Sequence, residues 1–447
     1  MNKLFQILLL SNLSLTLSAQ TRTLCINRNF EFTISEKEKN CMQSFDKNAG
    51  GINNVNAFLL SKMCELVYKE RLDYQFRFLK NNREPVSSIP NSDWIKANPI
   101  VTEANFECAF ASRFSHYFYS NTTELNKTKI IKPNDKIDLN IDKYALPKLD
   151  ADLPEFKYIH KSATTSFKLF GMKTSVGIDP ELVVVSTKDL VIIIFRGTDH
   201  LQDQEWGEWI GTDFNAGMTN AGGALQGTKI HNGFWSSFDL IRDQLLAELI
   251  RVKAKDKAIW VTGHSLGGAM AILTGVYLKA DGYPVKNVYS YSAPRTVGND
   301  KFAEKANSLL ANRIQRFEYY LDPITLMWAP GYTAFGRRNW MDHKDKGNGY
   351  DFFTNIGERF VAANPLEFNR SPINDSRTEA QVRLHKDKMD GLVTEVSWKF
   401  YFHNPQFCNK GLYKRLTQAE KDKLPALDDS FPYLYPSDPL NPYGGAK

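Results

Sequence analysis

The stretch from Ala258 to Ala280, AIWVTGHSLGGAMAILTGVYLKA, decides the fold. Its first five residues are apolar or β-branched, which predicts a short strand that ends at Thr262. The Ala- and Leu-rich run from Leu266 to Ala280, followed by Gly282, predicts a helix with a glycine cap. The predicted strand passes into the predicted helix through Gly263-His264-Ser265-Leu266-Gly267, a tight connection that would present a serine side chain.

This connection has the Gly-x-Ser-x-Gly spacing that is typical of a nucleophile elbow. A serine in so sharp a turn adopts a strained backbone, and the flanking glycines remove the Cβ clashes between helix and strand. We expect the Ser265 hydroxyl to stand above the sheet, with the positive end of the helix dipole behind it. The alternative is a serine that only caps a helix.

Strands and helices are predicted on both sides of this stretch. The runs at 181–186, 190–195, 287–291 and 316–321 read as strands, and the patterns at 54–70 and from Phe234 to about Lys255 read as helices. Strands that alternate with helices imply an α/β fold with a mostly parallel sheet, whose ligands bind beyond the carboxyl ends of the strands.

A serine nucleophile needs a base, and the base needs an orienting carboxylate. Asp322 directly follows the predicted strand Arg316–Leu321, which makes it the candidate acid, although it could also be a turn former before Pro323. For the base we favour His403, which follows an aromatic run, over His385 in a charged helical pattern and His343 in a polar loop.

The first 19 residues predict a cleaved secretory signal. Lys3 supplies the positive charge, Leu4 to Leu17 is mostly apolar, and Ala19 suits signal peptidase. An uncleaved anchor is the alternative, but the stretch is short and polar for a bilayer span. Cleavage would change the net charge from +6 to 6 − 1 = +5, and no later stretch offers about 18 uninterrupted apolar residues. The mature protein is therefore expected to be soluble and secreted, or periplasmic.

The composition excludes several classes of protein. Of the 447 residues, 42% are hydrophobic and 24% are charged, which is ample for a core and argues against a disordered chain. The basic residues are dispersed, so nucleic-acid binding is not expected. No His-Glu-x-x-His motif or phosphate-binding glycine loop occurs, so no metal and no organic cofactor is predicted. The oligomeric state is left open.

The chain has five cysteines, four of them in its first quarter: Cys25, Cys41, Cys64, Cys108 and Cys408. Export favours two disulfides and one free thiol. A more specific hypothesis pairs Cys408 with one of the N-terminal cysteines, which would fix the loop that carries His403. The alternative is that some of the cysteines are simply small buried apolar residues.

Seven motifs follow one another in a characteristic order. They are Phe195-Arg196-Gly197-Thr198, Trp209-Ile210 with Asp213, His231-Asn232-Gly233-Phe234, Gly263 to Gly268, Pro294-Arg295 with Gly298-Asn299, Asp322-Pro323, and His403 to Phe407. Through them, residues 53–330 and 398–414 resemble the class 3 lipases, the fungal lipase-like branch of the α/β-hydrolases. The resemblance implies an α/β-hydrolase fold, with a mostly parallel central sheet flanked by helices.

The resemblance also implies roles for single residues. Ser265 would be the nucleophile, His403 the base and Asp322 its orienting carboxylate. The oxyanion hole would combine Leu266 and Thr198, although Thr198 could instead be an ordinary strand-end residue. Arg196, His231 and Arg295 are expected to be structural, and the side chain of His264 is expected to point away from the serine.

The function implied is that of a secreted serine hydrolase, an enzyme that cleaves carboxylic esters and in particular lipid esters such as triacylglycerols. Transient contact with a lipid interface is possible in such an enzyme. A phospholipase A1 or a feruloyl-type esterase is the alternative within the same class. A non-catalytic binding protein on a hydrolase scaffold is the alternative from another class.

The expected domain organisation has four parts. They are a signal peptide (1–19), an N-terminal extension (20–52), a hydrolase domain (53–414) with insertions at about 71–150 and 331–397, and a Pro-rich C-terminal tail (415–447). The position of a lid, Asp199–Glu208, holds only Leu201 and Trp206 as large apolar residues, fewer than a lid that binds a lipid surface would carry.

Overall fold

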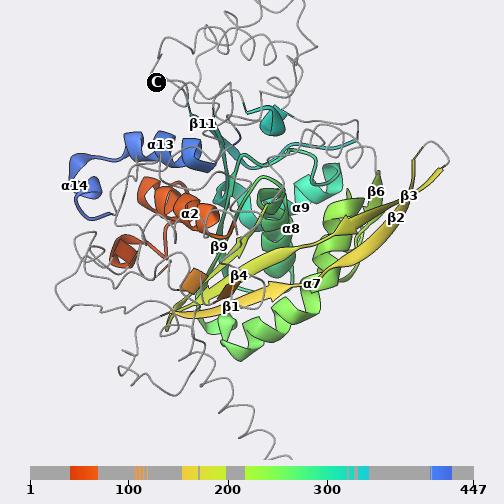
Figure 1. Cartoon of the computed structure of the whole chain (residues 1–447), viewed down its shortest axis with the longest axis horizontal. Coiled ribbons are helices and arrows are strands. Elements are labelled where there is room, and N and C mark those ends of the chain that lie inside the picture. Colours follow the sequence, from red (N-terminus) through yellow and green to blue (C-terminus); the bar gives the residue numbers. More distant parts are fainter. Residues whose placement is uncertain are drawn as a thin grey trace, which may run out of the picture.

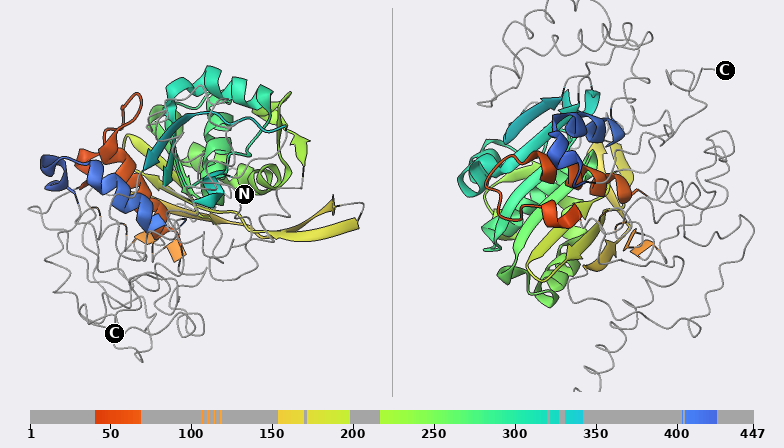
Figure 2. Two further views of the ribbon diagram at one scale, coloured as in Figure 1. Left: turned by 90° about the horizontal axis from the view of Figure 1, so that it is seen from above. Right: turned by 90° about the vertical axis from the view of Figure 1, so that its left-hand side faces the viewer.

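The computed structural model of the chain describes a core drawn from distant parts of the sequence. It describes residues 41–68, 106, 107, 110, 111, 114, 118, 154–169, 172–197, 217–319, 322–326, 331–341, 403 and 405–424. A central sheet lies between two layers of helices (Figures 1 and 2). This arrangement confirms the predicted α/β class.

The central sheet has seven strands in the order β1-β4-β5-β8-β9-β10-β11. Their bounds are β1 Glu155–His160, β4 Glu181–Ser186, β5 Leu190–Phe195, β8 Ala258–His264, β9 Val285–Tyr291, β10 Ile314–Tyr319 and β11 Arg337–Met341. The pairs β1/β4 and β4/β5 are antiparallel, and every pair from β5 to β11 is parallel. The carboxyl ends of β5, β8, β9 and β10 therefore meet at one edge.

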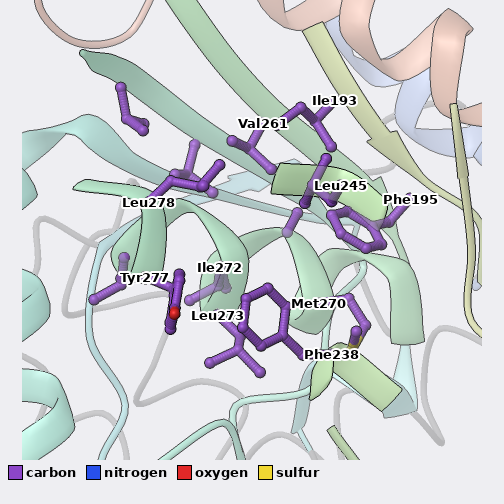
Figure 3. Close-up of a cluster of buried hydrophobic side chains, with 14 of the residues drawn as sticks. Ile193, Phe195, Phe238, Leu245, Val261, Met270, Ile272, Leu273, Tyr277 and Leu278 are labelled. Atoms are coloured by element: carbon purple, nitrogen blue, oxygen red, sulfur yellow. The ribbon is translucent and has the colours of Figure 1, made fainter. Parts of the chain in front are cut away.

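Three helices cover one face of this sheet: α7 Asn232–Arg251, α8 Leu266–Ala280 and α9 Asp300–Leu310. Figure 3 shows Phe238 of α7 and Met270 of α8 on this side of the sheet, with Ile193 of β5. All three side chains belong to one buried cluster. The alternating strand positions Val183, Val185 and Ile192 belong to the cluster of the opposite face.

Two helices from opposite ends of the chain cover that opposite face. They are α2 Asn54–Leu66 and α13 Pro405–Arg415, which lie side by side (Figures 1 and 2). Their side chains share one buried cluster with Trp260, Tyr289 and Phe317 of the strands. Two described helices that are far apart in the sequence therefore pack together on the same face of the sheet.

Smaller elements complete the description. A hairpin of β2 Ala163–Leu169 and β3 Met172–Ile178 projects from the body (Figures 1 and 2), and β6 Met218–Asn220 pairs with β7 Lys229–His231. Helix α14 spans Gln418–Lys421. The 3-10 turns are Cys41–Ser44, Gly223–Leu225, Ala254–Asp256, Ala311–Arg313 and Pro323–Leu326. Within the described ranges, none of the helices combines the length and apolar character that crossing a bilayer requires.

The packed region is larger than the expected hydrolase core. Strand β11 lies inside the expected insertion 331–397, yet it pairs in parallel with β10 as the last strand of the sheet. Cys41 and Phe45 of the expected extension, and Leu416 and Leu424 of the expected tail, are buried in the core. Core packing thus continues on both sides of the boundaries expected at 53 and 415.

A further buried stripe lies in the expected insertion 71–150. Phe106, Phe110, Phe114 and Phe118 are buried helical residues. The first three pack on Phe156 and Tyr158 of β1, and Phe118 packs on Phe114. A phenylalanine at every fourth position is a helical stripe that the sequence contains, but the polar residues between them hide it.

Several sequence predictions fall outside the described residues: the signal 1–19, Cys25, Cys108, Thr198, Asp199–Glu208, Trp209, Ile210, Asp213, His343, His385, and the tail from 425 onward.

The expectation of two disulfides is wrong. Cys64 and Cys408 are free thiols in the core, and each contacts a hydroxyl, that of Thr262 at 3.3 Å and that of Ser292 at 3.5 Å. With two of the five cysteines free, only 5 − 2 = 3 remain, too few for two bridges. The proposed disulfide of Cys408 is wrong for the same reason. Both residues instead act as small buried apolar residues.

Candidate active site

Ser265 occupies the turn between β8 and α8 with a backbone conformation that L-residues rarely adopt. Its φ is 57° and its ψ is −130°. The Ser265 N–H donates to the Tyr291 carbonyl at 2.9 Å, and the Ser265 carbonyl accepts from the Gly268 N–H at 2.9 Å. The end of β9 and the first turn of α8 thus hold the serine in a conformation that costs about 1–3 kcal/mol.

The glycines around Ser265 are required by close backbone contacts. A Cβ atom on Gly263 would lie 2.1 Å from the Gly267 carbonyl oxygen, and one on Gly267 would lie 2.6 Å from the Phe195 carbonyl oxygen. Neither backbone oxygen can move away as a flexible side chain could. These clashes are the steric reason why glycine is needed at both ends of the Gly-x-Ser-x-Gly motif.

The chain just past the end of β5 passes directly beside the serine. A Cβ atom on Gly197 would lie 3.1 Å from the Ser265 Cβ and 2.7 Å from the His264 carbonyl oxygen. Leu266 is the first residue of α8, so its N–H has no acceptor within the helix. Of the two predicted oxyanion-hole residues, Leu266 therefore lies beside Ser265, and Thr198 follows Gly197 outside the described residues.

Asp322 and His403 form a buried pair. Asp322 lies just past β10, where its N–H donates to the Tyr319 carbonyl at 3.0 Å. Nδ1 of His403 lies 3.0 Å and 2.9 Å from the two carboxylate oxygens, and both side chains are fully buried. A carboxylate can only accept, so Nδ1 carries the hydrogen and a neutral ring has its lone pair on Nε2. Of the candidate bases, His403 is thus the one that is hydrogen-bonded to the candidate acid, Asp322.

His264 links the serine turn to His403. Its Nε2 lies 2.7 Å from the His403 carbonyl oxygen, and its Nδ1 lies 2.7 Å from the Tyr68 hydroxyl. The centroids of the two imidazole rings are 4.7 Å apart. His403 therefore contacts Asp322 through its side chain and His264, the neighbour of Ser265, through its backbone.

Sequence reasoning gave no role to His264 or Tyr68. His264 was noticed because it directly precedes the serine, but the only expectation was that its side chain points away from Ser265. Tyr68 lies just past the end of α2, far from every motif, and nothing in the local sequence connects it to the site.

Two of the motif arginines have structural partners. Arg196 forms an ion pair with buried Glu181 at the end of β5, where the Tyr158 hydroxyl also donates to Glu181 at 2.6 Å. Arg295 contacts Glu318 at 3.1 Å. These contacts agree with the expectation that both arginines support the fold.

Glu318 is the centre of a buried charge cluster. Arg295, Arg316 and Arg338 surround its carboxylate, with the Arg338 Nε at 2.5 Å. Although burial alone would raise the pKa of Glu318, the three guanidinium groups lower it well below its ordinary value of 4.5. The cluster ties the loop after β9 to β10 and β11.

One group among the described residues has the composition of a metal site. Ligand-type atoms of His160, Asp179 and Glu181 lie within 4.8 Å of one another. The carboxylate of Glu181 already binds the Arg196 guanidinium and the Tyr158 hydroxyl. A cation would have to displace these partners beside a positive charge, so the group does not fit a resident metal.

Comparison with known proteins gives one family. Residues 192–330 match the family model described as lipase (class 3), which confirms the resemblance over that segment. This segment contains β5, β8 to β10, the Ser265 turn and Asp322. His403 lies beyond it.

Similar curated proteins include two kinds of enzyme. Secreted mono- and diacylglycerol lipase A of Penicillium cyclopium is 32% identical over 164 residues, which are 36% of this chain and 50% of that protein. Phospholipase A1-IIgamma of Arabidopsis thaliana is 28% identical over 240 residues, covering 46% of this chain and 56% of that protein. The chain thus spans about half the length of these relatives.

A crystal structure of a mutant form of MDLA from Penicillium cyclopium is also similar, with a TM-score of 0.32 and 28% identity. The match covers 38% of this chain and 61% of the chain in that crystal structure.

Proposed function

We propose that this chain is a secreted serine hydrolase that cleaves carboxylic esters, with lipid esters such as acylglycerols as its substrates. One observation carries the proposal. The His403 imidazole binds both oxygens of Asp322, while its backbone is tied to the residue that precedes Ser265 in a strained turn. A serine, an imidazole and a carboxylate in this relation form the machinery of acyl transfer.

In the first half of the reaction, Ser265 Oγ attacks the ester carbonyl carbon. Nε2 of His403 takes the hydroxyl proton, and the imidazolium that forms is stabilised by the Asp322 carboxylate. The negative charge that develops on the carbonyl oxygen is stabilised by the N–H of Leu266, at the positive end of α8, and by Thr198. Loss of one such donor typically costs about 3–4 kcal/mol of barrier.

The first half ends when His403 gives its proton to the leaving alcohol, so the carbon–oxygen bond of the ester breaks and an acyl-Ser265 remains. The second half repeats the chemistry with water: His403 takes a proton from a water molecule, which attacks the acyl group. The collapse of this second tetrahedral intermediate releases the carboxylic acid and returns the proton to Ser265. Neither half requires a metal or an organic cofactor.

Two observations support the lipid-ester part of the proposal. The curated relatives described above are named for mono- and diacylglycerols and for a phospholipid. Ser265 is 2% exposed, and Gly197, which lies beside it just past β5, is followed after Thr198 by the expected lid position. A serine enclosed in this way is shielded from water, which favours a substrate with an apolar acyl chain that is desolvated when it binds.

Secretion rests on the sequence of the first 19 residues and on the name of the Penicillium cyclopium relative, which is described as a secreted lipase.

A fluorophosphonate probe tests the serine chemistry directly. The folded protein is incubated with the probe, and peptide mapping locates the label, with Ser265→Ala as the matched control. Labelling at Ser265 that is lost in Ser265→Ala supports the proposal. Absence of labelling in correctly folded protein favours the alternative, a non-catalytic binding protein.

A substrate panel tests the ester class. Short p-nitrophenyl esters, emulsified di- and triacylglycerols, phosphatidylcholine and a feruloyl ester are compared at equal enzyme concentration. Acylglycerols are expected to give the highest kcat/KM. Preferential release of the sn-1 fatty acid from phosphatidylcholine would instead identify a phospholipase A1, the alternative that the Arabidopsis relative favours.

A further inference from the structure

The His264 imidazole is held between two partners that determine its protonation. The His403 carbonyl oxygen can only accept, so Nε2 of His264 carries a hydrogen and donates across 2.7 Å. The lone pair of the neutral ring is then on Nδ1, which accepts from the Tyr68 hydroxyl at 2.7 Å. Both contacts are satisfied by the neutral imidazole, and all three residues are buried.

A neutral His264 matters because the next ring is the proposed base. The two imidazole centroids are 4.7 Å apart, and the proposed mechanism places a positive charge on His403 in both halves of the reaction. A second imidazolium at this distance, away from water, would oppose that charge. The Tyr68 hydroxyl occupies the Nδ1 lone pair and thereby disfavours protonation of His264.

Helix α2, which ends just before Tyr68, also contacts α13, the helix that follows His403. In α2, three residues before Tyr68, Glu65 accepts from Asn409 of α13 at 2.6 Å and from Lys62 at 2.6 Å. The side chains of Lys62 and Glu65 are 3% and 0% exposed. The ring of Phe58 in α2 contacts that of Tyr413 in α13 at 5.4 Å. The N-terminal helix therefore contacts the His403 region in two ways, through α13 and through Tyr68 and His264.

We propose that Tyr68 and His264 are positioning residues that hold the backbone of His403, and with it the base, over Ser265. The inference rests on the proposed function. Neither residue touches the reacting atoms: His264 fixes the His403 carbonyl, and Tyr68 fixes the orientation and the neutral form of His264. A displacement of the base by about 1 Å is enough to lower a rate about 100-fold.

Kinetics of single variants on a soluble p-nitrophenyl ester test the inference. We expect Tyr68→Phe to lower kcat about 10-fold, the effect of one buried hydrogen bond, with KM nearly unchanged. His264→Ala is expected to lower kcat about 100-fold. His264→Gln is expected to recover part of that loss, because an amide N–H can replace Nε2 as the donor to the His403 carbonyl.

Tyr289→Phe is the matched control for Tyr68→Phe. It also removes one buried tyrosine hydroxyl, which donates to the Gly51 carbonyl at 2.6 Å and accepts from the Asn53 N–H at 2.9 Å. Tyr289→Phe should lower the thermal midpoint and leave kcat unchanged. The inference is overturned if Tyr68→Phe keeps the wild-type kcat, or if His264→Gln is no more active than His264→Ala.

A second measurement does not depend on turnover. In protein labelled with ¹⁵N-histidine, NMR reports which ring nitrogen of each imidazole carries hydrogen. We expect an Nε2–H His264, and an Nδ1–H resonance of His403 that shifts in Tyr68→Phe and not in Tyr289→Phe. An unchanged His403 resonance in Tyr68→Phe would contradict the positioning role. If the wild type hydrolyses no ester, the proposed function fails, and this spectrum still decides the inference.

Discussion

The His403 imidazole binds the Asp322 carboxylate across 81 residues of chain, with Nδ1 3.0 Å and 2.9 Å from its two oxygens. This contact sets the hydrogen on Nδ1, so Asp322→Asn, whose amide can donate to Nδ1, should favour the wrong tautomer. We expect kcat on a p-nitrophenyl ester to fall about 10⁴-fold while the protein stays folded.

The control for Asp322→Asn is the base itself. His403→Ala should reduce kcat at least as much, and circular dichroism should show that both variants are folded. Near-normal turnover by His403→Ala, together with loss of turnover in His385→Ala, would transfer the role of base to His385.

The conformation of Ser265 has a cost in stability that can be measured. At φ 57° and ψ −130°, a residue with a Cβ is strained and glycine is not. Ser265→Gly should therefore have a free energy of unfolding about 1 kcal/mol higher than Ser265→Ala, and neither variant should hydrolyse esters. Urea denaturation of the two variants makes the comparison, and equal or greater stability of Ser265→Ala would refute the strain.

The glycine before His264 should be irreplaceable for steric reasons. A Cβ on Gly263 would lie 2.1 Å from the Gly267 carbonyl oxygen, so Gly263→Ala must push α8 away from β8. We expect a loss of about 3 kcal/mol or more in the free energy of unfolding. Gly50→Ala is the matched control, since no atom lies within 4 Å of its Cβ position, and it should be neutral.

Local patterns were sufficient to predict the centre of this fold. The β-branched runs Glu181–Ser186 and Leu190–Phe195, and the Ala- and Leu-rich helix Leu266–Ala280, have in the structure the bounds that the sequence predicts. Ser265 and Asp322 could be located because each follows a predicted strand at its carboxyl end. These positions depend only on residues close to them in sequence.

Contacts between distant segments could not be predicted in this way. Tyr68 and His264 are 196 residues apart, and no periodicity or motif connects them. Strand β11 was missed because its sequence, RRNWM, is polar; its arginine Arg338 is buried only because Glu318 of β10 compensates it. Pairing of this kind is a property of the folded sheet.

The buried thiols should be inert in the native protein. Burial raises the pKa of the Cys408 thiol to about 12, and it raises that of Cys64 still further. Since the thiolate is the reactive form, neither residue should react with a maleimide until the chain is unfolded. Mass spectrometry of native and denatured samples checks this, and a disulfide at either cysteine in a map of unreduced peptides would contradict it.

Glu318 should make stability depend on pH in the acid range. Its pKa is lowered from 4.5 by the three arginines, so the folded state binds the proton more weakly than the unfolded state does. The stabilisation is therefore fully present above about pH 4.5 and is lost as pH falls toward the lowered pKa. The wild type should lose stability on acidification more steeply than Glu318→Gln.

At neutral pH the same substitution should be severe. Glu318→Gln leaves the buried Arg295, Arg316 and Arg338 without their shared carboxylate, and the free energy of unfolding should fall by about 3–5 kcal/mol. Asp239→Asn, which breaks an exposed pair with Arg242, should cost less than about 1 kcal/mol. Urea denaturation at several acid pH values gives the slope of the free energy of unfolding against pH for the wild type and for Glu318→Gln. Equal slopes would mean that Glu318 is not the group that titrates, because only a carboxylate held ionised by its arginines makes the two slopes differ.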